Sequence, residues 1–182
     1  MVAKFENINK TFCTSAGTYN WNEETSVNLN KGEILLITGK SEYSKKTLLT
    51  LMGCLINPNE GILEINGKNI NLSCFEEMAL IKSQNIGFVF HQHNLIDVIN
   101  TEENVGFPLK FQNLKSEEIK QKTIEALKMV EMYEHRKKMP KQLSKLEKQL
   151  ILIARALVIN PQIMVCDKPT AFLDRPSGVV IM

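Results

Sequence analysis

The chain has 182 residues, 43% of them hydrophobic and 23% charged, with a formal net charge of +2. These values are ordinary for one soluble globular domain with a single core, and so small a net charge gives no reason to expect nucleic acid as a partner. The four cysteines are far apart and form no C-x-x-C pair, which is typical of a reducing cytoplasm. We expect no signal peptide and no transmembrane segment.

The N-terminal half contains two predicted strands and a helix. Residues 33–38 are a short apolar run bounded by glycines, which indicates a buried strand. The leucines at helical spacing in residues 46–52 predict a helix after an intervening loop. Residues 61–67 alternate in polarity and end in Asn66-Gly67, so they indicate a half-exposed antiparallel strand closed by a tight turn.

The C-terminal half alternates between buried strands and amphipathic helices. Ile86–Phe90 and Ile163–Asp167 are predicted as buried strands, and residues 116–132 as a helix capped by Ser116. One face of that helix carries Ile119, Thr123, Leu127 and Val130. A second helix is expected to bury a stripe of Leu146, Leu150, Ile153 and Leu157, and to stop at Asn160-Pro161. The alternation predicts an α/β protein with a mostly parallel sheet.

Residues 39–47 partly match a phosphate-binding loop of the form G-x-x-x-x-G-K-[ST]. Such a loop uses glycines to curl backbone N–H groups around phosphate, a lysine for charge, and a hydroxyl for Mg²⁺. Gly39 and Lys45 are in place, but Ser44 replaces the second glycine and Lys46 replaces the hydroxyl residue. Taken alone, the match is weak, and an ordinary strand-to-helix loop is the favoured interpretation.

An ordered series of motifs decides between these interpretations. Ile86-Gly87-Phe88-Val89-Phe90, Gln142-Leu143-Ser144, Ile153-Ala154-Arg155-Ala156-Leu157 and Val165-Cys166-Asp167-Lys168-Pro169-Thr170 follow the loop along the chain. In this order the motifs resemble those of an ATP-binding-cassette (ABC) nucleotide-binding domain, and most closely the lipoprotein-releasing and macrolide-export type. The resemblance covers essentially the whole chain.

The resemblance implies a P-loop NTPase core with a mostly parallel sheet, an N-terminal antiparallel β region and a helical subdomain. In a single domain of residues 1–182, the core would comprise residues 1–84 and 141–182, and the helical subdomain residues 85–140. The family's last strands would be missing. Residues 176–182 would then lack a strand partner, and we expect a marginally stable protein that self-associates.

The resemblance also implies a site for ATP and Mg²⁺. Phe12 lies where the family stacks an aromatic ring on adenine, although a plain core or edge aromatic is the alternative. Asp167 matches the carboxylate that orders Mg²⁺ through water. The residues implied around the phosphates are Gly39, Ser41, Ser44, Lys45, Lys46 and Thr47.

Several of the implied functional positions carry the wrong residue. Lys168 stands where the family has its general-base glutamate, and His91 where it has a glutamine, with Gln92 one step later. His91 is either a metal ligand or a hydrogen-bonded strand-end histidine. Glu42 replaces a glycine and would repel a triphosphate. In the signature loop, Lys145, Leu146 and Glu147 replace Gly-Gly-Gln. No catalytic residue is intact, so we expect weak ATP and Mg²⁺ binding and lost or severely reduced hydrolysis.

Family membership would imply a cytoplasmic subunit, peripheral at the inner face of the membrane. Such subunits form head-to-tail homodimers and dock on a membrane permease, here through residues 85–140. Three hypotheses stay open: a working transport ATPase, a non-catalytic scaffold or regulatory module that binds a permease, and a decayed or artificial relative. Lys168 argues against the first.

Overall fold

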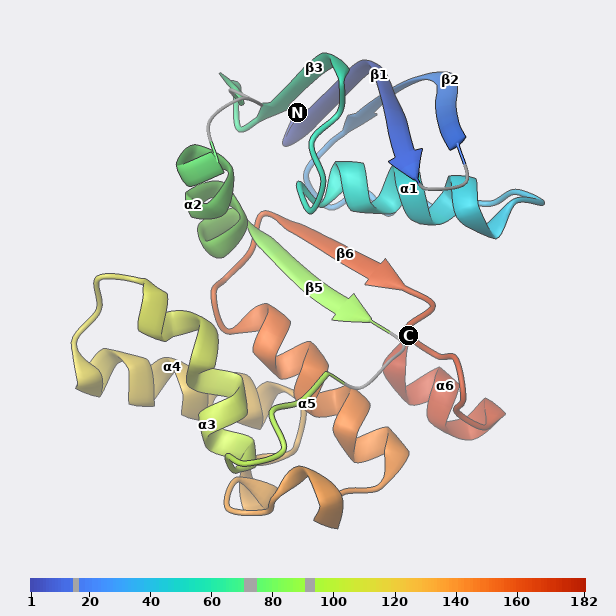
Figure 1. Cartoon of the computed structure of the whole chain (residues 1–182). Helices are drawn as coiled ribbons and strands as arrows, with labels where there is room; N and C mark the ends of the chain where they lie inside the picture. Colours follow the sequence, from blue (N-terminus) through green and yellow to red (C-terminus); the bar gives the residue numbers. More distant parts are fainter. Residues whose placement is uncertain (15–16, 71–74, 91–93) are drawn as a thin grey trace. The chain divides into compact units, whose positions relative to one another are not determined.

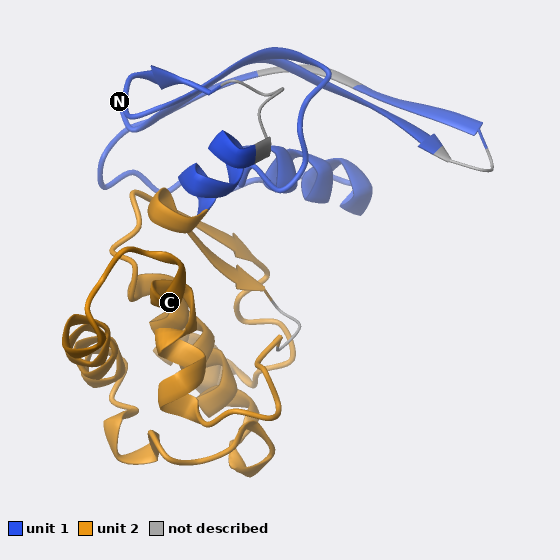
Figure 2. Cartoon of the chain, turned by 60° about the vertical axis from the view of Figure 1, so that its left-hand side comes forward, with its two compact units in different colours: residues 1–82 blue, residues 83–182 orange. Residues whose placement is uncertain are grey.

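The computed structural model describes residues 1–14, 17–70, 75–90 and 94–182. It divides into two compact units, Met1–Lys82 and Ser83–Met182 (Figure 2). Each unit has its own elements and is described by itself. The prediction of one domain with a helical subdomain inserted between two parts of a core stays a prediction.

The first unit contains a four-stranded antiparallel sheet in the order β2-β1-β3-β4. Its strands are β1 (Ala3–Thr14), β2 (Gly17–Leu29), β3 (Glu60–Ile65) and β4 (Lys68–Asn69). Asn66 and Gly67 form the two-residue turn between β3 and β4, both with positive φ as this hairpin requires. The predicted half-exposed strand and its turn are therefore confirmed.

Helix α1 (Glu42–Met52) begins four residues before the predicted helix. Ser41 is its N-cap, and Glu42 adds a favourable negative charge to the first turn. With glutamate and serine in place of glycines, this stretch is free to be helical. The positions expected to form an open phosphate loop are thus the first turn of a helix.

The strand predicted over residues 33–38 is wrong. These residues form neither strand nor helix, and the side chains of Ile34 and Leu36 are largely exposed. An apolar run indicates that a segment prefers burial. A strand also needs a neighbouring strand to form hydrogen bonds with its backbone N–H and C=O groups. In the described residues, the parallel pairing of strands is confined to β5 and β6.

In the second unit, β5 (Ile86–Phe90) and β6 (Ile163–Asp167) run parallel, with Ile86 opposite Ile163 and Phe90 opposite Asp167 (Figure 1). Both predicted strands are confirmed. Helix α5 (Lys145–Leu157) packs against β5 so closely that a Cβ on Gly87 would lie 2.7 Å from the carbonyl oxygen of Ala156. Helix α2 (Phe75–Asn85) leads into β5 across the boundary between the units.

The rest of the second unit is helical. Its elements are α3 (Thr101–Gly106), η1 (Phe107–Phe111), α4 (Ser116–Met129), η2 (Tyr133–His135), η3 (Pro140–Gln142) and α6 (Arg175–Ile181). Helices α3, α4 and α5 pack on one another. Their shared core contains Val105, Leu109, Ala126, Leu127, Met132, Leu143, Ile151, Ala154 and Val158.

Two details of the predicted helices are wrong. Lys115, not Ser116, is the N-cap of α4, and its backbone N–H donates a hydrogen bond to the Glu118 carboxylate. The most buried residues of α5 are Gln149, Ile151, Leu152, Ala154 and Ala156, whereas the predicted stripe of Leu146, Leu150, Ile153 and Leu157 is half-buried. Helix α5 contacts both β5 and the α3–α4 pair, so burial spreads beyond a single narrow stripe.

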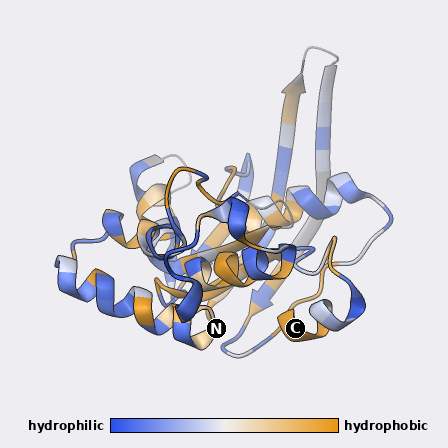
Figure 3. Cartoon of the chain, turned by 90° about the horizontal axis from the view of Figure 1, so that it is seen from below, coloured by the Kyte–Doolittle hydropathy of each residue, from blue (hydrophilic) through white to orange (hydrophobic). Residues whose placement is uncertain are grey.

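Residues 176–182 were expected to lack a partner strand. Residues 176–181 lie in helix α6, and Met182 follows it as the last residue of the chain. This helix contacts α5. Figure 3 shows its hydrophobic end beside the C-terminus, where Val179, Val180 and Met182 are exposed. Among the described residues, no helix is both long and apolar enough to cross a membrane.

Candidate functional site

The backbone N–H groups at the start of α1 are bonded within the helix turn. The Ser44 N–H donates to the Ser41 hydroxyl at 3.1 Å, and the Lys45 N–H donates to the Ser41 carbonyl at 3.2 Å. Ser44 lies inside the helix and is not one of the residues with a positive φ, so replacing glycine by serine costs no backbone strain here. A phosphate would have to compete for these donors, because two of them already have acceptors.

The lysine expected to contact phosphate is paired with a glutamate of its own helix turn. Lys45 Nζ lies 2.6 Å from Glu42 Oε1, with Lys45 partly buried and Glu42 exposed. Three residues apart on a helix, the two side chains share one face. The pair places a carboxylate where a phosphate oxygen would otherwise be attracted.

The other residues expected around the phosphates differ in accessibility. Gly39 is exposed and close to Lys45, since a Cβ built on it would lie 3.8 Å from Lys45 Cγ. Thr47 is buried, whereas Lys46 is exposed. Lys46 offers an ammonium where Mg²⁺ needs an oxygen ligand, so the first unit does not fit the metal. Within the described ranges, no three His, Cys, Asp or Glu side chains gather around a possible metal position.

Phe12 belongs to a group of aromatic rings in the first unit. Its centroid is 5.7 Å from that of Tyr43, and Tyr43 is 4.7 Å from Tyr19. Lys10 Nζ lies 5.8 Å from the Phe12 ring. Sequence analysis missed Tyr19 and Tyr43. Tyr19 could have been found by pairing β1 with β2, because Phe12 and Tyr19 are directly opposite each other in these two strands.

In the second unit, Asp167 ends β6 and is half-buried, as expected for a strand-end carboxylate. Lys168 follows it with a φ of 47° and an exposed side chain. Its carbonyl accepts the N–H of Ala171 at 2.9 Å. A left-handed conformation at a non-glycine residue costs roughly 1–2 kcal/mol, so this tight turn holds Lys168 in a strained backbone. His91 and Gln92 lie outside the described residues.

The segment matching the signature loop forms the capped start of α5. The Ser144 hydroxyl accepts the Glu147 N–H at 3.2 Å, and the Glu147 carboxylate accepts the Ser144 N–H at 2.6 Å. Glu147 Oε1 also lies 2.8 Å from His135 Nδ1, without a hydrogen bond between them, and 3.5 Å from Lys138 Nζ. Glu147 stands where the family has a glutamine, and its carboxylate is turned onto these neighbours.

The electrostatics of Glu147 follow from that position. The Ser144 N–H bond lowers the pKa of the Glu147 carboxyl, and burial opposes this effect. Lys138 and His135 lower the pKa further. Sequence analysis missed both partners, because they precede α5 by several residues and meet Glu147 only in the folded unit.

Arg155, in the motif at residues 153–157, and Asn104 of α3 serve the framework of the second unit. Arg155 donates to the Asn94 carbonyl at 3.1 Å and to the Asn94 side chain at 2.6 Å. Asn104, fully buried, accepts the Ile96 N–H at 2.8 Å and donates to the carbonyls of Ile96, Ile99 and Asn100. These bonds fix residues 94–100, so the retained motif residues hold a loop and make no visible chemical site.

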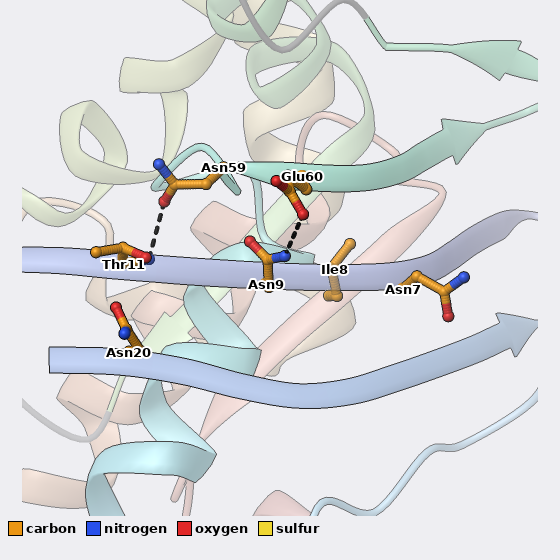
Figure 4. Close-up of a pocket in the computed structure, with 7 residues that line it drawn as sticks. All are labelled: Asn7, Ile8, Asn9, Thr11, Asn20, Asn59 and Glu60. Carbon is orange, nitrogen blue, oxygen red and sulfur yellow. Dashed lines mark hydrogen bonds between the residues drawn. The ribbon is translucent and has the colours of Figure 1, made fainter.

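A polar hollow of about 730 Å³ lies on the sheet of the first unit (Figure 4). Asn9 donates to Glu60 at 2.8 Å, and the Thr11 N–H donates to Asn59 at 2.8 Å. The lining is Asn7, Ile8, Asn9, Thr11, Asn20, Asn59 and Glu60. Glu60 is the one charged group in this lining and it is bonded to Asn9, so the hollow contains no charge cluster suited to a triphosphate.

Comparison with known proteins gives a consistent result. The family model described as ABC transporter matches residues 23–171. An uncharacterized ABC transporter ATP-binding protein, MJ0796 of Methanocaldococcus jannaschii, is 37% identical over 98% of this chain and 78% of its own length. The lipoprotein-releasing system ATP-binding protein LolD of Buchnera aphidicola is 34% identical over 96% of this chain and 76% of its own.

Two further relatives extend the comparison. The macrolide export ATP-binding/permease protein MacB of Mannheimia succiniciproducens is 31% identical over 97% of this chain and 28% of its own length. Among solved structures, a dimeric post-hydrolysis state of the cassette MJ0796 bound to ADP and Pi has a TM-score of 0.86. It is 36% identical, covering 98% of this chain and 79% of that one.

Proposed function

The chain belongs to the ABC transporter family, and its relatives include ATP-binding proteins of transporters. We propose that this chain retains ATP binding only in a weakened form. The chain acts as an ATP-binding subunit of a transporter that binds nucleotide weakly and has lost most or all hydrolysis. The observation that carries this proposal is the 2.6 Å pair between Lys45 and Glu42.

The pair weakens ATP binding in two ways. Lys45 must exchange its carboxylate partner for phosphate, so part of the attraction is already used within the chain. The freed Glu42 carboxylate then repels the triphosphate, by roughly 3 kcal/mol for unit charges about 5 Å apart at an effective dielectric near 20. Exposed pairs of this kind stabilise by only about 0.2–1 kcal/mol, so the repulsion is the larger effect.

In the proposed complex, Phe12 contacts adenine and Lys45 the β- and γ-phosphates. By its match to the family motif, Asp167 is the carboxylate proposed for a magnesium ion, but Lys46 brings no oxygen ligand. Lys168 is a lysine where a proton acceptor is needed, and at neutral pH an ordinary lysine cannot accept a proton. The remaining proposed phosphate contacts are Gly39, Ser41, Ser44 and Thr47.

For partners we propose a membrane permease and a second copy of the chain in a head-to-tail dimer. Support comes from a relative named as an ATP-binding/permease protein and from the dimeric cassette structures. Residues 85–140 are the proposed docking region, and the protein would sit at the cytoplasmic face of the membrane.

Calorimetric titration with MgATP, together with a phosphate-release assay, tests the proposal. We expect weak binding that depends on Lys45, changes little when magnesium is chelated, and is accompanied by no release above background. Tight binding that disappears with a chelator, or turnover comparable to active relatives, would contradict it. Lys45→Met is the matched loss-of-binding variant.

A non-catalytic scaffold that binds a permease is the second candidate. The observation favouring it is that Arg155 and the buried Asn104 fix the loop of residues 94–100. By contrast, Ser44, Lys46 and Lys168 replace residues expected at nucleotide. Binding to a permease that is equal with and without ATP, and unchanged in Lys45→Met, would favour the scaffold over the weak ATP-binding subunit.

A further inference from the structure

In the first unit, the ring of Tyr43 contacts those of both Phe12 and Tyr19. Phe12 and Tyr19 are opposite each other on β1 and β2, and Tyr43 is the second residue of α1. The planes of Phe12 and Tyr43 are inclined at 70°, and those of Tyr19 and Tyr43 at 83°. Edge-to-face contacts at these spacings are attractive, and the three rings are called here the aromatic cluster.

We propose that Tyr43 occupies the stacking surface of Phe12, and that a nucleobase can bind there only after Tyr43 has moved away. The proposal rests on the proposed function in one respect, namely that Phe12 is the surface for the base. It adds that the chain carries its own competitor for this surface.

The competition follows from the space around Phe12. A base stacks with its plane parallel to the ring and in van der Waals contact, and therefore needs one clear face. Tyr43, inclined at 70° with its centroid 5.7 Å away, contacts the Phe12 ring. Lys10 Nζ is a second neighbour, 5.8 Å from the centre of the same ring. Both groups gain an attraction from Phe12 that a base would have to replace.

Tyr43 is the part of the cluster that can move. Phe12 and Tyr19 are held by the register of two paired strands, whereas Tyr43 lies in the first turn of a helix, and helix ends fray. Tyr43 is 47% exposed, so it can swing into solvent. The closed cluster and an open one are thus two states, and a base that binds only the open state binds with an affinity reduced by the open fraction.

The test uses adenosine, which has a base and no phosphate, titrated into the folded full chain and its variants. Tyr43→Ala should bind adenosine about two- to tenfold more tightly than the wild type, from the usual strength of one aromatic pair. Tyr43→Phe keeps the ring and should match the wild type. Adding Phe12→Ala to Tyr43→Ala should remove the gain.

The proposal is overturned if Tyr43→Ala binds adenosine with equal or lower affinity than the wild type. Should that variant fail to fold by circular dichroism, the wild type still decides the question by NMR. Saturating adenosine must then abolish the ring-to-ring nuclear Overhauser effect between Tyr43 and Phe12, and its persistence would refute the displacement. Inorganic tripolyphosphate, titrated in parallel, reports on Lys45 and the other proposed phosphate contacts without a base. It therefore separates this outcome from failure of the proposed function.

Discussion

Lys45 Nζ and Glu42 Oε1, 2.6 Å apart in the first turn of α1, form an ion pair within the segment that matches a phosphate-binding loop. Ser41 caps the same turn. Because the cap, the acidic residue and the lysine all stabilise helix here, the replacement of glycines does more than remove flexibility. The glutamate also gives the lysine an intramolecular ion-pair partner.

Glu42→Gln should strengthen MgATP binding by about tenfold, or ~1.4 kcal/mol. This is less than the full repulsion between unit charges, because solvent screens the exposed Glu42 side chain. The substitution frees Lys45 and removes the carboxylate that repels phosphate, while a glutamine keeps the helix. Calorimetric titration measures the change. Glu76→Gln is the control, because it removes the same charge from the first turn of another helix. Equal affinity of Glu42→Gln and the wild type would show that the pair does not limit binding.

Lys168→Glu alone should not restore ATP hydrolysis. Loss of a general base commonly reduces rates by about 10²–10⁴, yet Lys46 still supplies no oxygen for the metal in this variant. We expect a phosphate-release assay to stay at background for both the wild type and Lys168→Glu. Turnover after this single substitution would mean that the phosphate loop is competent as it stands.

Glu147 should stabilise the second unit in a pH-dependent way. Its pKa is lowered in the folded state, chiefly by the Ser144 N–H, so the folded protein binds the proton less tightly than the unfolded chain does. The stabilisation is therefore present above the ordinary carboxyl pKa and is lost as the pH falls through the lower, folded value.

Glu147→Ala should accordingly destabilise the protein by about 1 kcal/mol at pH 7, the usual value of a helix cap. The difference from the wild type should shrink towards pH 3 as the wild-type carboxylate protonates. Urea denaturation at the two pH values checks this, with Glu117→Ala in the first turn of α4 as control. A difference that grows in acid would contradict the stated direction of the pKa shift.

Much of the second unit could be predicted from sequence, because its elements satisfy themselves locally or with one neighbour. Ile86–Phe90 and Ile163–Asp167 pair with each other, and the apolar face of α4 packs on its adjacent helices. Residues 33–38 show the limit. Their apolar character was visible, but the presence of a pairing strand is not a local property of the segment.

The candidate site was predictable by position more than by geometry. Lys45 and Phe12 could be placed by motif, but their contacts to Glu42 and Tyr43 depend on where the helix starts. The predicted start at residue 46 left Glu42 and Tyr43 in an open loop, whereas the Ser41 cap begins the helix at Glu42. The charged contacts of Glu147 were invisible for another reason, since His135 and Lys138 reach it through tertiary structure.

Asn104→Ala should destabilise the second unit by about 3 kcal/mol. The buried side chain makes four hydrogen bonds to the loop before α3, and its loss leaves the Ile96 N–H and several carbonyls without this partner. Each unsatisfied buried group costs about 1–3 kcal/mol, reduced where water enters. Urea denaturation provides the measurement, and Asn113→Ala, at an exposed position, should be nearly neutral. A similarly small effect for Asn104→Ala would mean that the loop does not need this anchor.

Replacing Ile34 and Leu36 together by serine should reduce self-association of the chain. The two side chains are 93% and 80% exposed, on a segment of apolar character that forms no strand. Exposed apolar segments with unpaired backbone groups favour association with another chain. Because neither side chain is buried, the double substitution should change the free energy of unfolding by no more than about 0.5 kcal/mol.

Sedimentation velocity across a range of concentrations measures the effect, and the double variant should stay monomeric at concentrations where the wild type associates. Val98→Ser, also at an exposed apolar residue (82%), is the matched control and should associate as the wild type does. A wild type that is already monomeric at high concentration would contradict the prediction. Association that survives in the double variant would mean that the self-association interface lies elsewhere. The exposed Val179 and Val180 of α6 would then be the next residues to substitute.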